Sequence, residues 1–232
     1  MVFKVQEKVK IKWSSDFAYA VGLIASDGCL SKDKSHISFH SKEIELINKF
    51  KCALDLDNKP YRAARGGERE KKYFVLAFGD KVFYQYLNGI GITSAKSKTI
   101  KAVNVPDNFF ADFFRGLFDG DGTFYTFWDK RWPNSFGFKI SIASASLDFI
   151  KWLKQRLADL YDVKGYAHKG DGVLNLEYVK GDSKRLFAVM YHKVNLLFFS
   201  KKYIKVKNAL EKDKKLGIDA LQKPRNAAVA QR

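Results

Sequence analysis

Two short segments of the 232-residue chain share a pattern that ends in an acidic residue followed by glycine. Residues 22–28 read GLIASDG and residues 116–122 read GLFDGDG, so Asp27 and Asp121 hold the same place at an offset of 121 − 27 = 94. Two parallel helices ending at these residues would bring both carboxylates to one end, where helix carboxyl termini are already partly negative. Carboxylate oxygens suit Mg²⁺, and a bound divalent cation can activate water for phosphodiester hydrolysis. Asp27 and Asp121 are therefore candidate catalytic and metal-binding residues.

A simpler interpretation is that each Asp-Gly pair only ends a packed helix. Glycine suits the left-handed conformation just past a helix, and we expect it at Gly28. For one motif alone this interpretation is the better one. For a matched pair on a chain of net charge +17 it is disfavoured, because two facing carboxylates repel each other without a cation between them.

The two motifs belong to a longer repeat. Residues 37–41 (ISFHS) and the segment after them are similar to residues 140–144 (ISIAS) and their sequel, at an offset of 140 − 37 = 103. The larger offset indicates an insertion in the second copy, in the aromatic stretch YTFWDKRWPNS. Two ordered matches favour a duplication. They predict an α+β fold, with a pseudo-twofold αββαββα repeat, two antiparallel sheets and paired central motif helices.

Hydrophobic periodicity places the elements of each copy. The first copy is expected to have helices at 16–27, 42–54 and 80–89, and strands at 29–33, 36–41, 60–65 and 72–79. The second is expected to have helices at 107–119, 145–160, 181–192 and 201–215, and strands at 123–129, 136–143, 164–168 and 173–179. The predicted organisation is a first half over 1–101, a linker over 102–106, a second half over 107–215 and a basic tail over 216–232.

Small residues mark the faces through which the two motif helices would pack. Ala18, Gly22 and Ala25 fall on one face of the first helix, and Gly116 supplies the same gap in the second. Asp119 stands where the first motif has Ala25. We interpret Asp119 as a hydrogen-bonding residue of the helix interface.

The basic excess is uneven along the chain. Residues 1–104 carry 19 basic and 11 acidic side chains (net +8), residues 105–200 carry 13 and 11 (net +2), and residues 201–232 carry 10 and 3 (net +7). The excess predicts a polyanionic partner, with nucleic acid first and an acidic membrane surface second. The last segment is either a solvated basic helix or a helix that contacts phosphates.

Composition excludes several classes of protein. No apolar run reaches the roughly 20 residues of a membrane span, and the first residues lack a signal-peptide core. Two cysteines, Cys29 and Cys52, are too few for a disulfide framework or a four-ligand zinc site. A hydrophobic content of 46% is enough for a sizeable core.

The two motifs resemble those of single-chain LAGLIDADG homing endonucleases. AVGLIASDG at 20–28 and FRGLFDGDG at 114–122 carry the resemblance, and GITSAKS at 91–97 and FFSKKY at 198–203 are similar to flanking segments of that family. The resemblance implies a monomer that needs no protein partner and uses Mg²⁺, with Mn²⁺ as a substitute. It further implies cleavage of both strands of double-stranded DNA across the minor groove, with short 3′ overhangs.

The resemblance also implies one basic residue from each half near the attacking water and the leaving group. Lys96 in GITSAKS and Lys202 in FFSKKY match those places. Lys98 and Lys201 are the alternatives, one or two residues away. The proposed catalytic set is therefore two aspartates and two lysines.

The resemblance implies a saddle of two sheets that lies along a major groove. Strand alternation assigns the residues expected to contact DNA. In the first half they are Lys32, Lys34, His36, Ser38, His40, Arg62, Arg65, Arg69, Lys71 and Tyr73. In the second half they are Tyr125, Phe127, Lys130, Arg131, Lys139, Ser141, His168, Lys169 and Glu177. Because the halves differ in sequence, we expect an asymmetric target.

The leading hypothesis is a site-specific endonuclease with a long duplex target. The alternative is a non-cleaving protein of the same fold, either an RNA-splicing maturase or a DNA-binding regulator. Retention of both aspartates and both lysines favours cleavage. We expect the protein in the cytoplasm, or in the organelle or nucleoid that holds its target DNA, and not at a membrane.

Overall fold

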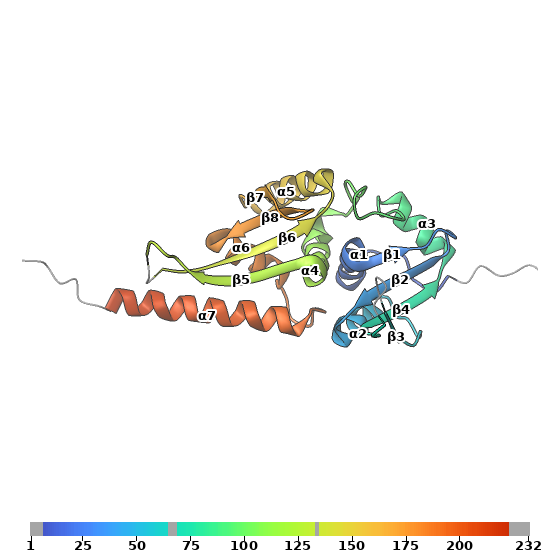
Figure 1. The fold of residues 1–232 in the computed structure, drawn as a ribbon, viewed down its shortest axis with the longest axis horizontal. Helices are drawn as coiled ribbons and strands as arrows, with labels where there is room; N and C mark the ends of the chain where they lie inside the picture. The colour runs from blue at the N-terminus through green and yellow to red at the C-terminus, as the bar shows by residue number, and fades with distance from the viewer. Residues whose placement is uncertain (1–6, 65–68, 133–134, 223–232) are drawn as a thin grey trace, which may run out of the picture.

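The computed structural model describes residues 7–64, 69–132 and 135–222, and side-chain surroundings as far as residue 217. Two similar halves lie on either side of a central pair of helices, α1 (Ser15–Asp27) and α4 (Phe110–Asp121) (Figure 1). Each half contains one four-stranded antiparallel sheet. The α+β architecture with paired central helices is the one that the sequence predicts.

The first half follows the predicted order of elements. After α1 come β1 (Gly28–Leu30), β2 (His36–Ser41), α2 (Ile44–Ala53), β3 (Tyr61–Ala63), β4 (Tyr73–Gly79) and α3 (Lys81–Gly89). The strands lie in the order β1-β2-β4-β3. Ile37 and Phe39 of β2 are fully buried, whereas His36, Ser38 and His40 beside them are not, so one face of the sheet packs on the core.

The second half repeats this order with longer elements. A 3-10 turn, η1 (Asp107–Phe109), leads into α4, which is followed by β5 (Gly122–Trp128), β6 (Phe136–Ser144), α5 (Leu147–Tyr161), β7 (Tyr166–Lys169), β8 (Leu174–Val179), α6 (Lys180–Met190) and α7 (Ser200–Gln222). The strand order β5-β6-β8-β7 matches that of the first sheet. α7 is longer than the predicted 201–215 and extends into the predicted tail. Leu210 and Leu216 continue its apolar stripe and pack against the core.

The registers of the two hairpins confirm the duplication and the place of the insertion. Gly28 pairs with Phe39, and Gly122 pairs with Ile142. These pairs reproduce the offsets of 94 and 103 found in the sequence. The additional residues lengthen the β5–β6 hairpin in the aromatic stretch, as expected.

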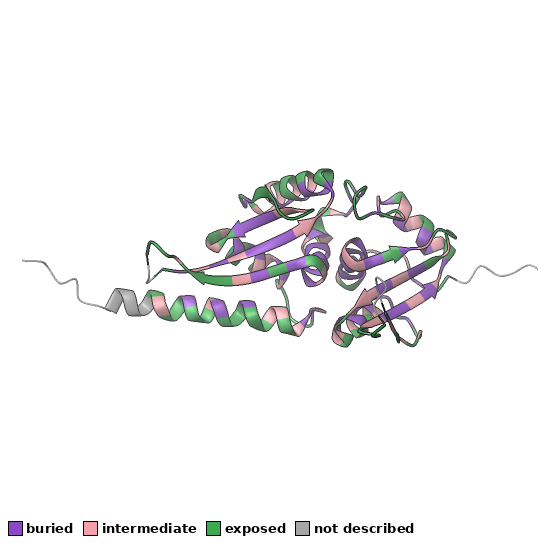
Figure 2. Ribbon diagram, viewed as in Figure 1, coloured by how far each residue is buried: buried purple, intermediate pink, exposed green. Residues whose placement is uncertain are grey.

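The central helices are buried on nearly all sides (Figure 2). Residues 17–25 of α1 and residues 112–119 of α4 are all buried. A helix that is buried all round belongs to the interior of a protein, and both sheets turn their apolar faces toward this pair.

In the described part of the chain, no helix combines the length and apolarity needed to cross a membrane.

Candidate functional site

The two central helices meet backbone to backbone at a pair of glycines. A Cβ atom at Gly22 would overlap the backbone of α4, and one at Gly116 would overlap the carbonyl oxygen of Tyr19. Further along, a Cβ atom at Gly120 would collide with Ser26. Contacts nearer the end of α1 are made with residues nearer the end of α4, so the helices are parallel and end side by side.

Asp27 and Asp121 are the last residues of these two helices and therefore lie at the same end. Asp27 Oδ2 is 3.4 Å from where a Cβ atom of Gly120 in the other helix would be. Both carboxylates are close enough to Lys202 to act on its charge. Asp27 also lines a pocket of about 350 Å³, together with Ser41. The structure thus brings together the two carboxylates that the sequence singles out.

The glycine after each aspartate does not adopt the left-handed conformation expected for Gly28. Gly28 has φ −74° and ψ 149°, and Gly122 has φ −74° and ψ 148°, which are extended values. Glycine is needed for space instead: a Cβ atom would lie 2.6 Å from the Cα of Ile24 at Gly28, and 2.7 Å from the Cα of Phe118 at Gly122. The chain can therefore pass directly from each helix into a strand, with the aspartate at the junction.

A lysine closes the carboxyl end of each central helix. Lys96 Nζ donates to the carbonyl oxygens of Ser26, at 3.0 Å, and Gly28, at 2.7 Å. Lys202 Nζ donates to the carbonyl oxygens of residues 118–120, at 2.7, 2.8 and 2.9 Å. Cations are favourable at this end of a helix because the carbonyl dipoles point toward them. The two lysines therefore occupy equivalent places in the two halves.

The structure separates these lysines from their alternatives. The Lys201 side chain is 73% exposed and pairs with Glu43, and Lys98 is exposed. By contrast, Lys96 is buried and Lys202 is half-buried. Of the four lysines, Lys96 and Lys202 are those that reach the helix ends beside the aspartates.

Burial changes the proton affinity of Lys202. It lowers the pKa of Lys202 from the ordinary 10.5 to about 8, and the charges of Asp119, Asp121 and Asp27 limit the fall. The lysine is therefore still mainly protonated at pH 7 but titrates closer to neutrality than a surface lysine does. Its charge offsets part of the repulsion among the neighbouring carboxylates.

Asp119 ties the start of α7 to the central helices. Its buried carboxylate accepts a hydrogen bond from the Tyr19 hydroxyl at 2.8 Å and one from the backbone N–H of Phe199 at 2.7 Å. Phe199 immediately precedes α7, so this contact holds the segment that carries Lys202. The structure places Asp119 in the helix interface, where the sequence suggested a hydrogen-bonding role.

Replacing Asp119 with asparagine is expected to remove a pH dependence of stability. Burial raises the pKa of Asp119 from 3.8 to about 7, although hydrogen bonds from Phe199 and Tyr19 act in the opposite direction. Between about pH 4 and pH 7 Asp119 holds its proton more often in the folded protein than in the unfolded chain, so its contribution to the free energy of unfolding falls as the pH rises. Urea unfolding across this window should show the fall in the wild type and a flatter profile in Asp119→Asn. An identical profile in both proteins would contradict this account.

The first sheet presents most of its predicted DNA-contacting strand residues on one face. The face away from the core carries His36, Ser38, His40 and Tyr73. The predicted groove-facing orientation of Arg62 is wrong, because Arg62 pairs with Phe74 and so lies on the core-facing side. Its guanidinium carbon stands 4.3 Å from the centre of the Phe74 ring.

The other first-half candidates lie outside the strands. Lys32 and Lys34 are in the turn after β1. The strand ends three residues earlier than expected. The cause is the Asp33 carboxylate, which closes the turn by accepting hydrogen bonds from the backbone N–H groups of residues 35 and 36. The remaining ones are Arg69 and Lys71, exposed just before β4, and Arg65, which lies outside the described residues.

The second sheet shows a similar division. The face away from the core carries Tyr125, Phe127, Lys139, Ser141, His168 and Glu177. The predicted groove-facing orientation of Lys169 is wrong, because Lys169 pairs with Leu174, whose other neighbour Ser144 lies on the core-facing side. Lys130 and Arg131 are exposed in the turn between β5 and β6.

Glu177 is the centre of a polar cluster on this second face. Its carboxylate accepts hydrogen bonds from Lys139 Nζ, at 2.9 Å, and from the hydroxyls of Tyr125 and Tyr166, and His168 Nε2 lies 3.5 Å away. Burial alone would raise the pKa of Glu177, but hydrogen bonds from the tyrosines and Lys139 lower it to about 2. Tyr166 is missing from the predicted set, although it lies two residues before His168 and alternation would have included it.

The acidic pair fits a cation that is shared with a substrate. Among the described residues, no group of three or more His, Cys, Asp or Glu side chains is placed to hold a metal ion. Mg²⁺ commonly uses only one or two carboxylates, with water and substrate phosphates as its other ligands. Asp27 and Asp121 match that pattern and not the closed four-ligand set of a structural zinc site.

Comparison with known proteins agrees with this architecture. Residues 108–190 match the model of the LAGLIDADG-like domain. A search of curated protein sequences gave no significant match. The matched segment covers most of the second half, and the first half repeats its strand order around α1.

Solved structures share the fold at low sequence identity. The LAGLIDADG meganuclease I-AabMI bound to uncleaved DNA has a TM-score of 0.60 and 12% identity, over 88% of this chain and 92% of that chain. A variant of the homing endonuclease I-DmoI, in complex with nicked target DNA and in the presence of Mn, has a TM-score of 0.50 and 15% identity, over 79% and 98%. Full-length DUF199/WhiA from Thermotoga maritima has a TM-score of 0.53 and 13% identity. The match covers 89% of this chain but only 64% of the WhiA chain.

Proposed function

We propose that this chain, which has the two-motif LAGLIDADG fold, is a site-specific endonuclease that cuts both strands of a long, asymmetric DNA duplex. The observation that carries the proposal is the convergence of Asp27 and Asp121 at the joined ends of two parallel helices, with Lys96 and Lys202 on the neighbouring carbonyl groups. The fold alone is not sufficient support, since WhiA, which is not named as an endonuclease, shares it.

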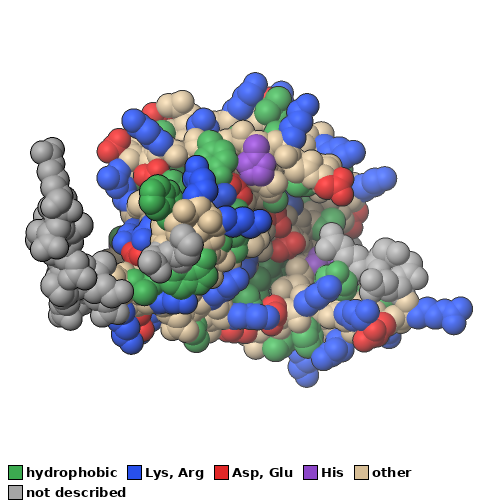
Figure 3. All heavy atoms as spheres, turned by 60° about the vertical axis from the view of Figure 1, so that its left-hand side comes forward, with side chains coloured by type: hydrophobic (Ala, Val, Ile, Leu, Met, Phe, Trp, Pro, Cys, Tyr) green, Lys and Arg blue, Asp and Glu red, His purple; other side chains and the backbone are tan. Residues whose placement is uncertain are grey.

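Charge and surface chemistry support a DNA duplex as the substrate. The chain has a net charge of +17, and Figure 3 shows Lys and Arg side chains spread over the end of the second half. The outward faces of both sheets carry imidazole, hydroxyl and amino groups, which are the groups that contact base edges in a major groove. Structural relatives such as I-AabMI are bound to DNA. A single chain of the present kind would lay one sheet on each half of its target.

The residues at the helix ends have separable tasks in this proposal. Asp27 and Asp121 would hold the divalent cation, Mg²⁺ or Mn²⁺, which would activate water and neutralise charge at the scissile phosphate. The I-DmoI variant in the presence of Mn supports dependence on a divalent metal. Lys202 donates to three carbonyl groups, which uses all three hydrogens of an ammonium group. We therefore assign it the neutralisation of the end of α4, and Lys96 the same task at α1.

Cleavage of a duplex library tests the proposal. The protein is incubated with a randomised duplex library in Mg²⁺ and, separately, in Mn²⁺, and the cut ends are captured and sequenced. We expect cutting at one family of related asymmetric sites, with short 3′ overhangs, and none after chelation of the metal. Specific binding to duplex DNA without cutting in either metal would reject the endonuclease.

Lys202→Met is expected to slow cleavage by about 100-fold, which is a typical effect of removing a preorganised charge from an active site. The loss should be larger than any change in DNA affinity, because Lys202 lies on the helix carbonyls and not on an outward sheet face. Lys201→Met is the matched control, since it removes the same charge from the adjacent, exposed position. Single-turnover cleavage and binding measurements on a selected duplex give the comparison. Equal losses of cleavage in both variants would show that position 202 has no special role.

DNA binding is expected to weaken steeply with salt. Neutralising six to ten phosphates costs roughly 10³-fold to 10⁵-fold in affinity between 50 and 200 mM salt. The net charges of +8 and +2 in residues 1–104 and 105–200 place more of these contacts on the first half. Fluorescence anisotropy on a labelled duplex over this salt range gives the slope. A slope near zero would be inconsistent with a binding surface built from lysine and arginine.

The alternative is a non-cleaving DNA-binding regulator or an RNA-splicing maturase. Its support is the likeness to WhiA over 89% of this chain. Competition between a selected DNA duplex and a structured intron RNA separates these possibilities. Stronger binding of the RNA, together with the absence of DNA cleavage, would favour the maturase.

A further inference from the structure

The two β-hairpins that follow the central helices differ in length. The β1–β2 ladder contains three residue pairs, Gly28 to Leu30, and the β5–β6 ladder contains seven, Gly122 to Trp128. At ~3.3 Å per residue, four more pairs lengthen the second hairpin by about 13 Å. Figure 1 shows this extension running away from the central helices. An isolated two-stranded ribbon is marginally stable in water, so it needs support.

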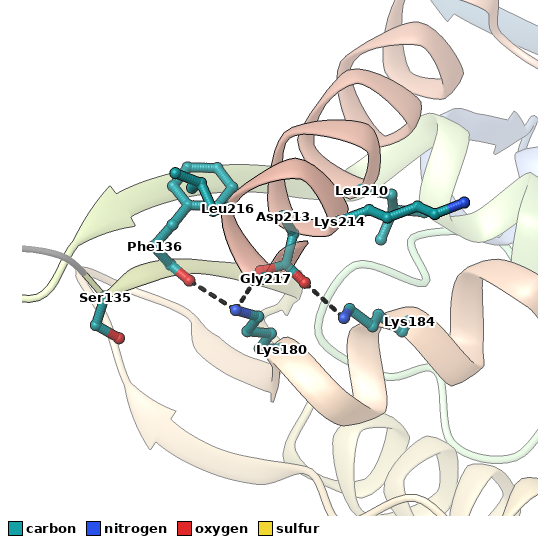
Figure 4. Close-up of a pocket in the computed structure, with 9 residues that line it drawn as sticks. All are labelled: Ser135, Phe136, Lys180, Lys184, Leu210, Asp213, Lys214, Leu216 and Gly217. Carbon is teal, nitrogen blue, oxygen red and sulfur yellow. Dashed lines mark hydrogen bonds and ion pairs between the residues drawn. The ribbon is translucent and has the colours of Figure 1, made fainter. Parts of the chain in front are cut away.

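α7 supplies that support on the core-facing side of the extension. Phe136, at the start of β6, is 5% exposed and lines a pocket together with Leu210 and Leu216 of α7 (Figure 4). Lys212 Nζ lies 4.9 Å from the centre of the Trp128 ring and 4.8 Å from that of Phe136. Trp128 and Phe136 are register partners, so α7 covers both strands at the outer end of the ladder.

An ionic cluster fixes α7 to α6 at the same place. Asp213 of α7 is 8% exposed and forms ion pairs with Lys180 and Lys184 of α6 (Figure 4). Lys180 Nζ also donates to the carbonyl oxygen of Phe136 at 3.0 Å. Through Asp213 and Lys180, the helix pair and the start of β6 are therefore joined in one network.

The outward face of the extension carries groups that can contact DNA. On the strands these are Tyr125, Phe127 and Lys139. In the turn they are Lys130, Arg131 and Trp132, all exposed. Cationic side chains contact phosphates, and apolar groups contact the thymine methyl in the major groove. The extension is thus supported on one face and able to bind on the other.

We propose that the braced β5–β6 hairpin reaches about four base pairs farther along the duplex than β1–β2, so that the two half-sites of the target have unequal lengths. The reach follows from about 13 Å of additional ribbon and ~3.4 Å per base pair. α7 acts as the support of this hairpin and not as a phosphate-binding helix. The inference rests on the proposed DNA-binding function.

Hydroxyl-radical footprinting on a duplex selected by binding tests the reach. The triple variant Lys130→Ser, Arg131→Ser, Trp132→Ser is expected to lose protection at one end of the site only. Lys32→Ser, Lys34→Ser changes the turn of the shorter hairpin and is expected to lose protection at the opposite end. In the wild-type footprint, protection should extend about four base pairs farther from the cleavage position at the end that the triple variant loses than at the end that the double variant loses, as the additional ribbon length implies. Equal reach at both ends, or uniform weakening of protection along the site in both variants, would overturn the inference.

Asp213→Asn separates mechanical support from electrostatic attraction. The change breaks both ion pairs yet makes α7 more positive, so a phosphate-binding α7 would bind DNA more tightly. A supporting α7 predicts the opposite: protection is lost at the end assigned to the long hairpin and kept elsewhere. Glu211→Gln is the matched control, because it removes the same charge from an exposed position of α7 and should leave the footprint unchanged.

The outcomes distinguish the inference from the proposed function. Tighter binding of DNA by both α7 variants, with an unchanged footprint, would overturn the supporting role of α7. A wild-type protein that binds no specific duplex would overturn the proposed function, and the inference with it. Thermal unfolding of each variant shows whether the fold is kept before its footprint is interpreted.

Discussion

Asp27→Asn and Asp121→Asn should each lower the rate of double-strand cleavage by about 10³-fold or more, which in effect abolishes it, while DNA binding is kept. Asparagine preserves the size of the side chain but removes the negative charge that attracts a hard divalent cation. A bound cation contributes several kcal/mol of charge stabilisation at the phosphate, and each ~1.4 kcal/mol is a factor of ten in rate. Cleavage of a selected duplex in Mg²⁺ measures the loss, and Kd determined without divalent metal measures binding.

Glu43→Gln is the control for these variants. Glu43 lines the same pocket as Asp27 and pairs with the exposed Lys201, so the change removes an equal charge without touching the helix ends. We expect its cleavage rate to stay within a few-fold of wild type. Double-strand cutting at the wild-type rate by either asparagine variant would exclude the paired-carboxylate site.

The second large effect concerns stability: Gly22→Ala and Gly116→Ala should each destabilise the protein by about 3 kcal/mol or more. In an ordinary helix, glycine to alanine is stabilising by roughly 1 kcal/mol. Here the added Cβ atom would overlap backbone atoms of the facing helix, which cannot rotate away as a side chain can. Overpacking of this kind costs about 1–3 kcal/mol, and more where the backbone must shift. Urea unfolding measures the change.

Gly181→Ala is the matched control, since Gly181 lies in α6 and a Cβ atom there would have nothing within 4 Å. We expect this control to be neutral or slightly stabilising. The central variants should also lose cleavage, because separating α1 from α4 moves Asp27 away from Asp121. A stabilised Gly22→Ala protein would contradict the close approach of the two helices.

Much of the architecture could be predicted from the sequence because both copies of the repeat contain the same local sequence patterns. The offsets of 94 and 103 predicted the two equivalent hairpins and the insertion between β5 and β6, and the register bears this out. The Asp-Gly junctions were identified by spacing alone. The conformation of these junctions was not predicted. The extended conformation of Gly28 results from its close contact with Ile24 and not from a local preference at the end of a helix.

Edge strands mark the point where sequence reasoning failed. Arg62 and Lys169 lie in β3 and β7, which have three and four residues. Runs that short hold too little alternation to set a face, and a shift of one residue turns every side chain to the other side of the sheet. Their faces were decided by the register of pairing with Phe74 and Leu174 in the next strand along the chain, and a run this short does not encode that register.

Residue type and spacing therefore determined that this basic chain contains two copies of a helix that ends in an acidic residue. They also determined the place where the second copy is longer than the first. The tertiary structure decided which lysines accompany them. Lys96 and Lys202 are 106 positions apart (202 − 96), an offset that matches neither 94 nor 103, yet each reaches the carbonyl groups of one helix end. It also decided that α7 lies under the long hairpin. Both outcomes depend on contacts between distant segments, which follow from packing and leave no periodic signal in the sequence.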